Sequence, residues 1–226
     1  MRRVRFKTHE QMAKLGNFLR LDRYDVEFPK YDKNEENAKA TLVNVFRGDA
    51  VAGLLHIRRA DEDFLLLVEQ FRMPTLIDPE TGMPDLDKVH EGEHAGRLLE
   101  LMAGMQKPGE PWLEAFRREC FEETNLQPDR VEFITSYYPS PGACSERIHL
   151  YYGRVEVPPD TPLLDHEHED DESYGDDTED IRRVFMKPEA FLEAVEQGEI
   201  QDGKALAAAE WMRRKSSAEK MDIELK

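Results

Sequence analysis

The chain has 226 residues, of which 39% are hydrophobic and 35% are charged, and its formal net charge is −17. This length suffices for one sizeable core, or for a core with a small additional domain. The strongly negative charge argues against a nucleic-acid-binding surface, and no apolar run is long enough to span a membrane. The basic N-terminus lacks an apolar signal core, and two cysteines make no disulfide framework, so we expect a cytoplasmic protein.

Short β-rich segments separated by polar residues or glycine fill the first third of the chain. We predict strands within residues 17–28, 41–46, 50–59 and 63–72, and we expect the first of them to form a separate small sheet. The proline- and acid-rich segment 74–95 follows. It is long for a loop of a compact domain, which predicts an insertion, a lid or a dimer element.

The second half of the chain mixes strands with helices. Residues 98–104 are predicted to form a strand that leads into a glycine loop, and the next helix has Pro111 in its first turn. The remaining predicted elements are strands at 131–138 and 147–157, an acidic loop at 165–180, a strand at 181–187 and helices at 188–200 and 203–215. Strands mixed with three helices predict an α+β fold.

The segment 104–126, GMQKPGEPWLEAFRRECFEETNL, carries the most informative pattern of the chain. Glu119, Glu122 and Glu123 recur at helical spacing, so they lie on adjoining parts of one helical face. Like charges at this spacing cost a helix roughly a few tenths of a kcal/mol per pair. A bound Mg²⁺ or Mn²⁺ would offset that cost, because hard cations prefer oxygen ligands. The alternative is a solvated acidic face.

This segment resembles the signature of the Nudix hydrolases, which cut nucleoside diphosphates linked to another group. The signature is G-x5-E-x7-R-E-U-x-E-E-x-G-U, in which U is apolar, and only its last glycine differs, because Asn125 stands there. Asparagine tolerates the left-handed conformation that ends a helix, so the helix end should be kept. Cys120 occupies an apolar position and is expected in the core.

Further segments resemble the branch of ADP-ribose pyrophosphatases and nucleoside diphosphate sugar hydrolases. They are VEQFR (68–72), ELMAGM (100–105), SPGACSER (140–147), TEDIR (178–182) and GEIQDGKALAAAEWM (198–212). The resemblance spans residues 16–215 and implies Mg²⁺-dependent hydrolysis of ADP-ribose or a related nucleotide sugar. GEIQDGK also resembles GDP-mannose-cleaving relatives, so GDP-mannose or another diphosphate is an alternative substrate. A non-catalytic nucleotide-binding regulator is the alternative from another class, which the intact Arg118 and glutamates disfavour.

The resemblance also implies an architecture. It is an α/β/α sandwich with an N-terminal antiparallel β-sheet that is swapped between the subunits of a homodimer. The corresponding division is a β-rich dimerisation segment at 1–60, a hydrolase domain at 61–216 and a tail at 217–226.

The resemblance assigns roles to individual residues. The implied metal ligands are the backbone carbonyl of Ala103 and the side chains of Glu119, Glu123 and Glu179, with Glu122 as a further candidate through water. The implied substrate contacts are Phe18, which stacks on the base from the partner subunit, and Arg47, Arg72, Met105, Ser140 and Glu146.

Two residues are candidates for the general base. Asp177 stands where that branch carries a glutamate, and Glu179 is the alternative. Arg118 is expected to pair with a neighbouring glutamate and to aim it. Without the resemblance, Arg72 would be interpreted as a surface ion-pair residue and Phe18 as part of the sheet core.

Overall fold

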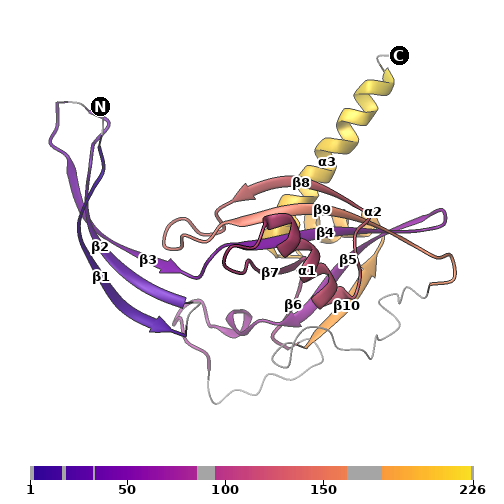
Figure 1. Ribbon diagram of the computed structural model, residues 1–226, viewed down its shortest axis with the longest axis horizontal. Helices are drawn as coiled ribbons and strands as arrows, with labels where there is room; N and C mark the ends of the chain where they lie inside the picture. Colours follow the sequence, from indigo (N-terminus) through magenta and orange to yellow (C-terminus); the bar gives the residue numbers. More distant parts are fainter. Residues whose placement is uncertain (1–2, 17–18, 33, 86–94, 162–179, 225–226) are drawn as a thin grey trace. The chain divides into compact units, whose positions relative to one another are not determined.

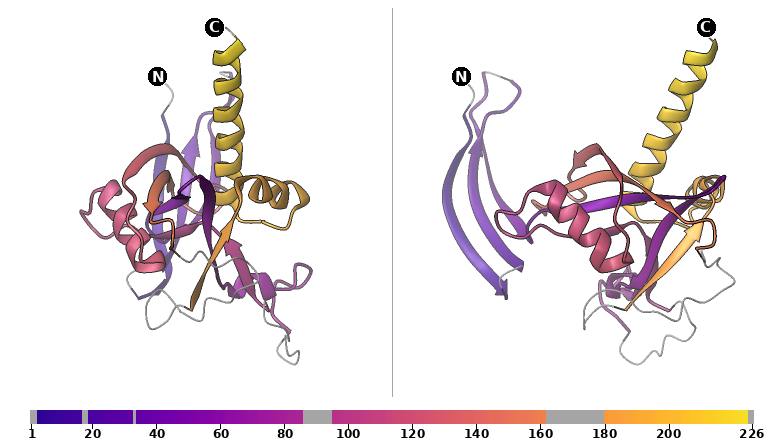
Figure 2. Two further views of the ribbon diagram at one scale, coloured as in Figure 1. Left: turned by 90° about the vertical axis from the view of Figure 1, so that its right-hand side faces the viewer. Right: turned by 45° about the vertical axis from the view of Figure 1, so that its right-hand side comes forward.

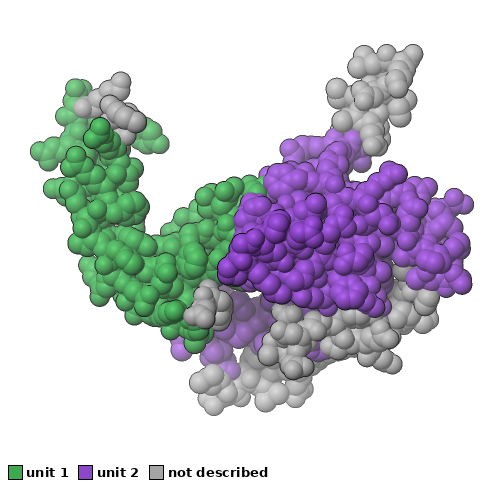
Figure 3. Space-filling view, in the orientation of Figure 1, with its two compact units in different colours: residues 1–50, 136–148 green, residues 51–135, 149–226 purple. Residues whose placement is uncertain are grey.

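The computed structural model describes residues 3–16, 19–32, 34–85, 95–161 and 180–224, with side chains up to residue 216 (Figure 1). The chain folds into two compact units (Figure 3). The small unit comprises residues 1–50 and 136–148, and the large unit comprises residues 51–135 and 149–226. In chain order the elements are β1 (Arg5–Leu15), β2 (Leu19–Phe28), β3 (Ala38–Phe46), β4 (Ala50–Arg59), β5 (Glu62–Phe71), the 3₁₀ helix η1 (Met73–Leu76), β6 (Arg97–Glu100), β7 (Met102–Met105), α1 (Trp112–Thr124), β8 (Arg130–Tyr137), β9 (Ile148–Val157), β10 (Ile181–Met186), α2 (Pro188–Gln197) and α3 (Gly203–Glu224).

The small unit contains the separate sheet that the sequence predicted. Its strands follow the order β1-β2-β3, and β2 pairs antiparallel with both neighbours. β1 was not predicted, because every one of its residues is exposed and its sequence therefore lacks the alternation of a half-buried strand. Backbone pairing with β2 is what makes this segment a strand.

The larger sheet has the order β10-β5-β4-β9-β8, with β6 paired to β5 and β7 paired to β4. β4 lies in this sheet and pairs antiparallel with β5, whereas the sequence-based division assigns residues 50–60 to the N-terminal segment. Its first six residues are all buried, as in a strand that is covered on both faces. The two compact units accordingly divide at residue 50.

Two predicted elements differ from the structure. The single strand predicted at 98–104 was wrong, because β6 and β7 are separate strands that flank the buried Leu101 and pair with different neighbours. An apolar run does not show where a chain changes its pairing partner. The last helix continues beyond the predicted residue 215, to Glu224.

Helices cover both faces of the large sheet, as expected for an α/β/α sandwich (Figure 2). Tyr151 and Tyr152 are neighbours on β9, so their side chains point to opposite faces. Tyr151 stacks on Phe116 of α1, with ring centroids 5.1 Å apart, whereas Tyr152 lies 5.2 Å from Trp211 of α3. None of the described helices has both the length and the apolarity needed to cross a membrane.

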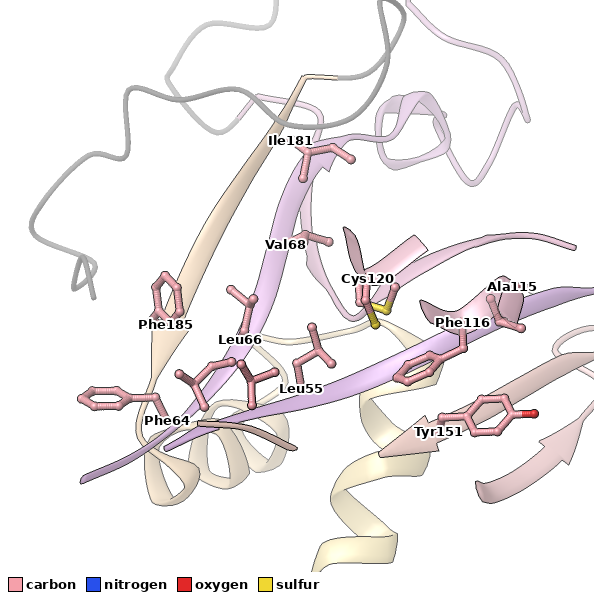
Figure 4. Packing of buried hydrophobic residues seen from close by; sticks show 14 residues of the cluster. Leu55, Phe64, Leu66, Val68, Ala115, Phe116, Cys120, Tyr151, Ile181 and Phe185 are labelled. Carbon is pink, nitrogen blue, oxygen red and sulfur yellow. The ribbon is translucent and has the colours of Figure 1, made fainter. Parts of the chain in front are cut away.

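The core lies between α1 and the sheet (Figure 4). Phe116 and Cys120 of α1 are fully buried, which confirms Cys120 as a core residue, and burial raises the pKa of its thiol. A Cβ at Gly53 of β4 would overlap the Phe116 ring. Glycine at this position therefore lets α1 pack closely on the sheet, which fixes the helix that carries the glutamates.

The end of α1 confirms the expectation for Asn125. This residue adopts the left-handed conformation, with φ 54° and ψ 26°, and its N–H donates to the carbonyl of Phe121. Asparagine thus takes the place of the signature glycine with the backbone that such a helix end requires.

We predict that Asn125→Ala lowers the free energy of unfolding by about 1 kcal/mol, because alanine tolerates a positive φ poorly. Asn125→Gly should be as stable as the wild type or more so. Urea denaturation of the three proteins checks this. Equal midpoints for the alanine and glycine variants would contradict it.

Candidate active site

Two buried glutamates on α1 form the centre of the site. Glu119 and Glu123 are one helical turn apart, and their residues are 7% and 3% exposed. Buried carboxylates are costly unless hydrogen bonds satisfy them. Glu123 accepts a hydrogen bond from the N–H of Ala103 in β7, at 3.2 Å. This bond joins the helix to the strand that carries the predicted backbone ligand.

The carboxylate of Glu119 lies against the backbone of Gly104. A Cβ at this position would overlap the carboxyl carbon and both carboxylate oxygens of Glu119. Glycine at 104 thus lets the carboxylate keep the position in which Arg118 holds it, which is a structural reason for the first glycine of the signature.

Arg118 holds the surroundings of these glutamates together. Its Nε and Nη2 donate to the two oxygens of Glu110, at 2.9 and 3.0 Å. Its Nη1 donates to Glu119 and to Glu122, both at 2.7 Å, and Nη2 also donates to the carbonyl of Met105. The pairing that we expected for Arg118 is therefore present, and it extends to three glutamates.

The ion pairs change the pKa values of the partners. The hydrogen bonds that Arg118 donates, above all those to Glu110, raise the pKa of its guanidinium above the ordinary value. Reciprocally, the hydrogen bond from Arg118 lowers the pKa of Glu110 to about 2. Both groups are thus charged across the whole neutral range.

Glu122 lies on the exposed side of α1, where Lys107 approaches it to 3.8 Å in addition to Arg118. Of the three glutamates at 119, 122 and 123, only Glu119 and Glu123 are buried. Within the described parts of the chain, no group of three or more histidine, cysteine or acidic side chains is arranged to hold a metal ion. The predicted ligand Glu179 and the predicted base Asp177 lie outside the described residues.

The buried pair nevertheless fits a divalent cation. Two carboxylates one turn apart face β7, and the backbone of Ala103 and Gly104 lies directly against them. These are hard oxygen donors, which Mg²⁺ and Mn²⁺ prefer. Glu119, Glu123 and the carbonyl of Ala103 would hold such an ion.

Arg72 lies directly after β5 and pairs with a buried partner. Its Nε donates to Oε1 of Glu100 at 2.6 Å, and the Glu100 side chain is 3% exposed. Nζ of Lys204 donates to the other oxygen of Glu100 at 2.8 Å and to Asp202 at 2.9 Å. Arg72 is thus an ion-pair residue, as the alternative interpretation holds, but its partner Glu100 is buried and shared with Lys204.

Sequence reasoning did not assign functions to Glu100, Asp202 or Lys204. Both segments that contain these residues, ELMAGM and GEIQDGK, carry the family resemblance. Glu100 and Lys204 are nevertheless 104 positions apart in the chain. Nothing in either segment alone shows that a carboxylate of one faces an ammonium of the other.

Among the described residues, three predicted substrate contacts belong to the small unit. Arg47 Nε lies 3.3 Å from Glu146 Oε1, and Glu146 is buried. The carbonyl of Ser140 accepts hydrogen bonds from the N–H groups of Ala143 and Cys144, which closes a turn. The structure thus brings Arg47 and Glu146 together. Phe18, the predicted aromatic contact, lies outside the described residues.

Comparisons with known proteins agree with the sequence pattern. The family model of the NUDIX domain matches residues 47–209. The GDP-mannose pyrophosphatase of Yersinia pestis (strain Pestoides F) is 30% identical over 193 residues, which cover 84% of this chain and 82% of that protein. The ADP-ribose pyrophosphatase of Haemophilus influenzae is 30% identical over 152 residues, which cover 67% of this chain and 61% of that protein.

A solved structure shows the same fold. The crystal structure of an ADP compounds hydrolase superposes with a TM-score of 0.64, and the match covers 96% of this chain and 95% of that chain. The sequence identity is 16%, so this similarity concerns the fold.

We predict that the ion pair of Glu110 stabilises the fold in a pH-dependent way. The pKa of Glu110 is lower in the folded protein than in the unfolded chain, so its contribution is complete above about pH 4.5 and disappears as the pH falls towards 2. The difference in unfolding free energy between wild type and Glu110→Gln should be constant from pH 6 to 8 and shrink in acid.

Urea denaturation at several pH values measures this difference. Glu114→Gln is the control, because Glu114 is an exposed glutamate nearby in the chain, in the first turn of α1. A Glu110 difference that stays constant down to the lowest pH at which the wild type folds would refute the prediction.

Proposed function

Because the chain belongs to the Nudix family, we propose that it is a pyrophosphatase that hydrolyses nucleoside diphosphate sugars to a nucleoside monophosphate and a sugar phosphate. The observation that carries this proposal is the buried pair Glu119 and Glu123 against Ala103 and Gly104, with Glu119 held by Arg118 and Glu123 by the N–H of Ala103. A protein that only binds nucleotides would not need two buried carboxylates at this cost.

We propose Mg²⁺ as the cation, with Mn²⁺ as a substitute. When bound, it would neutralise charge on the diphosphate and lower the pKa of a bound water. The protein's own residues prepare this site. Arg118 holds one oxygen of Glu119, and the N–H of Ala103 holds one oxygen of Glu123, so both carboxylates are oriented before a ligand arrives.

Arg72 is the proposed contact for the diphosphate. Its side chain is 37% exposed, and a planar guanidinium can donate to two phosphate oxygens at once. Arg47, Met105, Ser140 and Glu146 are further proposed substrate contacts. The general base is proposed to be Asp177, or Glu179 if Asp177 is too short to reach the attacking water.

Two nucleotide sugars are candidate substrates within this proposal. GDP-mannose and ADP-ribose are the substrates in the names of the two similar proteins described above. The alternative of a non-catalytic regulator is disfavoured, because Arg118, Glu119 and Glu123 form an ordered, hydrogen-bonded arrangement.

The proposal includes a homodimer joined through the small sheet, with Phe18 contributed to the partner's site. Support comes from one face of this sheet, where Phe6, Leu42 and Phe46 are 70%, 50% and 41% exposed. They pair with Val26, Tyr24 and Arg20 of β2, which are even numbers of residues apart and therefore point to one face. Phe6, Leu42 and Phe46 lie on that same face. An apolar face of this kind marks an interaction surface.

A cytoplasmic location is also proposed, and the two free thiols support it.

We predict Mg²⁺-dependent release of a nucleoside monophosphate from at least one member of a panel of ADP-ribose, GDP-mannose, UDP-glucose and diadenosine polyphosphates. Glu123→Gln should lower kcat on the order of 10²-fold or more, because it removes a charged cation ligand. The amide oxygen can still accept from Ala103, so the fold should persist.

Product analysis and thermal melting with added Mg²⁺ check both statements. Mg²⁺ should raise the melting temperature of the wild type and of Glu114→Gln, but not that of Glu119→Gln/Glu123→Gln. No turnover of any substrate by folded wild type would overturn the enzymatic proposal.

We predict a dimer in solution and its dissociation by Phe6→Ser/Leu42→Ser, which makes the apolar face polar. Light scattering over a concentration series measures the mass. Leu206→Ser is the control, because Leu206 is an exposed leucine of α3. A wild-type monomer at every concentration would exclude the dimer.

A further inference from the structure

Glu100 occupies an unusual position between two cations. Its two carboxylate oxygens are used separately, since Oε1 accepts from Nε of Arg72 and Oε2 accepts from Nζ of Lys204. With a side chain that is 3% exposed, Glu100 depends on these bonds in place of water. A carboxylate that is held at both oxygens cannot rotate without breaking one of these two hydrogen bonds.

Lys204 is itself fixed from the other side. Its Nζ donates to Oδ1 of Asp202, and Oδ2 of Asp202 accepts from the backbone N–H groups of Leu101 and Ala205. Burial lowers the pKa of Lys204, but Asp202 and Glu100 outweigh this effect and raise it above its ordinary value. The ammonium is therefore charged at neutral pH and keeps Oε2 of Glu100 occupied.

The main chain of Arg72 is also held in place. Its N–H donates to the carbonyl of Gly96 at 2.7 Å, and its carbonyl accepts from the backbone and hydroxyl of Thr75. The root of the side chain and its Nε are thus both fixed. The structure records no partner for the two terminal nitrogens among the residues that it describes.

An isolated carboxylate would bind a guanidinium through two parallel hydrogen bonds and take up at least one terminal nitrogen. Here Arg72 instead makes one hydrogen bond, through Nε, and the second oxygen of Glu100 accepts from Lys204. Arg72 is then oriented through Nε alone, and both terminal nitrogens remain able to donate to an anion. The negative charge of Glu100 is shared between two cations, so it neutralises Arg72 only in part.

We propose that Glu100 is a positioning residue that orients Arg72 towards the diphosphate of the substrate. This inference rests on the proposed function, since it presupposes a nucleoside diphosphate sugar as the ligand. Glu100 itself does not contact the substrate. Its effect on substrate binding therefore passes entirely through Arg72.

A double-mutant cycle tests this dependence. Glu100→Gln should raise KM roughly tenfold with little change in kcat, because it replaces the ion pair with Arg72 by a weaker hydrogen bond to an uncharged amide. In an Arg72→Ala background, the same substitution should leave KM unchanged within about twofold. Glu100→Asp, which keeps the charge but shortens the reach, is the second variant in case the glutamine variant does not fold.

Glu62→Gln is the matched control. Glu62 begins β5, the strand that ends directly before Arg72, and it also accepts from one arginine and one lysine, Arg59 at 2.6 Å and Lys187 at 3.2 Å. Its substitution should leave KM and kcat at the wild-type values.

The outcomes separate the two proposals. Folded wild type that turns over no nucleotide sugar overturns the proposed function, and the role of Glu100 with it. If the wild type is active but Glu100→Gln raises KM equally with and without Arg72, or does not raise it at all, only the positioning role is overturned. A KM effect that disappears without Arg72 supports it.

Discussion

The site depends on one guanidinium group. Arg118 donates to Glu110 through two of its nitrogens, to Glu119 and Glu122 through the third, and also to the carbonyl of Met105. It therefore connects the end of β7, the loop before α1 and the helix itself. Without the Arg118 guanidinium, the carboxylates of Glu110, Glu119 and Glu122 would repel one another. The position in which Glu119 can bind a metal ion would then be unfavourable in the metal-free protein.

The same physical principle governs the second charged group of the large unit. Arg72, Glu100, Lys204 and Asp202 alternate in sign, and the buried members satisfy each other's charges. Both groups meet where β6 ends and β7 begins. Asp202 binds the N–H of Leu101, and Glu123 binds the N–H of Ala103. Residues 101–103 are thereby held by side chains from two separate parts of the chain, which gives the backbone at the centre of the site a fixed position before any ligand binds.

The family relationship and the geometry explain different parts of the function. Sequence similarity and the family model assign pyrophosphatase chemistry to the chain. The geometry adds how the carboxylates are oriented, and why glycine at 104 and asparagine at 125 are compatible with the helix between them. The small sheet exposes Phe6 and Leu42, and this is the surface at which we propose that a second subunit binds.

The sequence by itself determined the α1 glutamates, the left-handed end at Asn125, the buried Cys120 and most of the strands, because these features depend on local spacing and local conformation. It did not determine β1, which has no buried face, or the break at Leu101, where the chain changes strand partners. Nor did it show that Glu100 lies between Arg72 and Lys204. That arrangement is decided by tertiary structure, because only the packing of α3 beside the sheet brings residues a hundred positions apart within hydrogen-bonding distance.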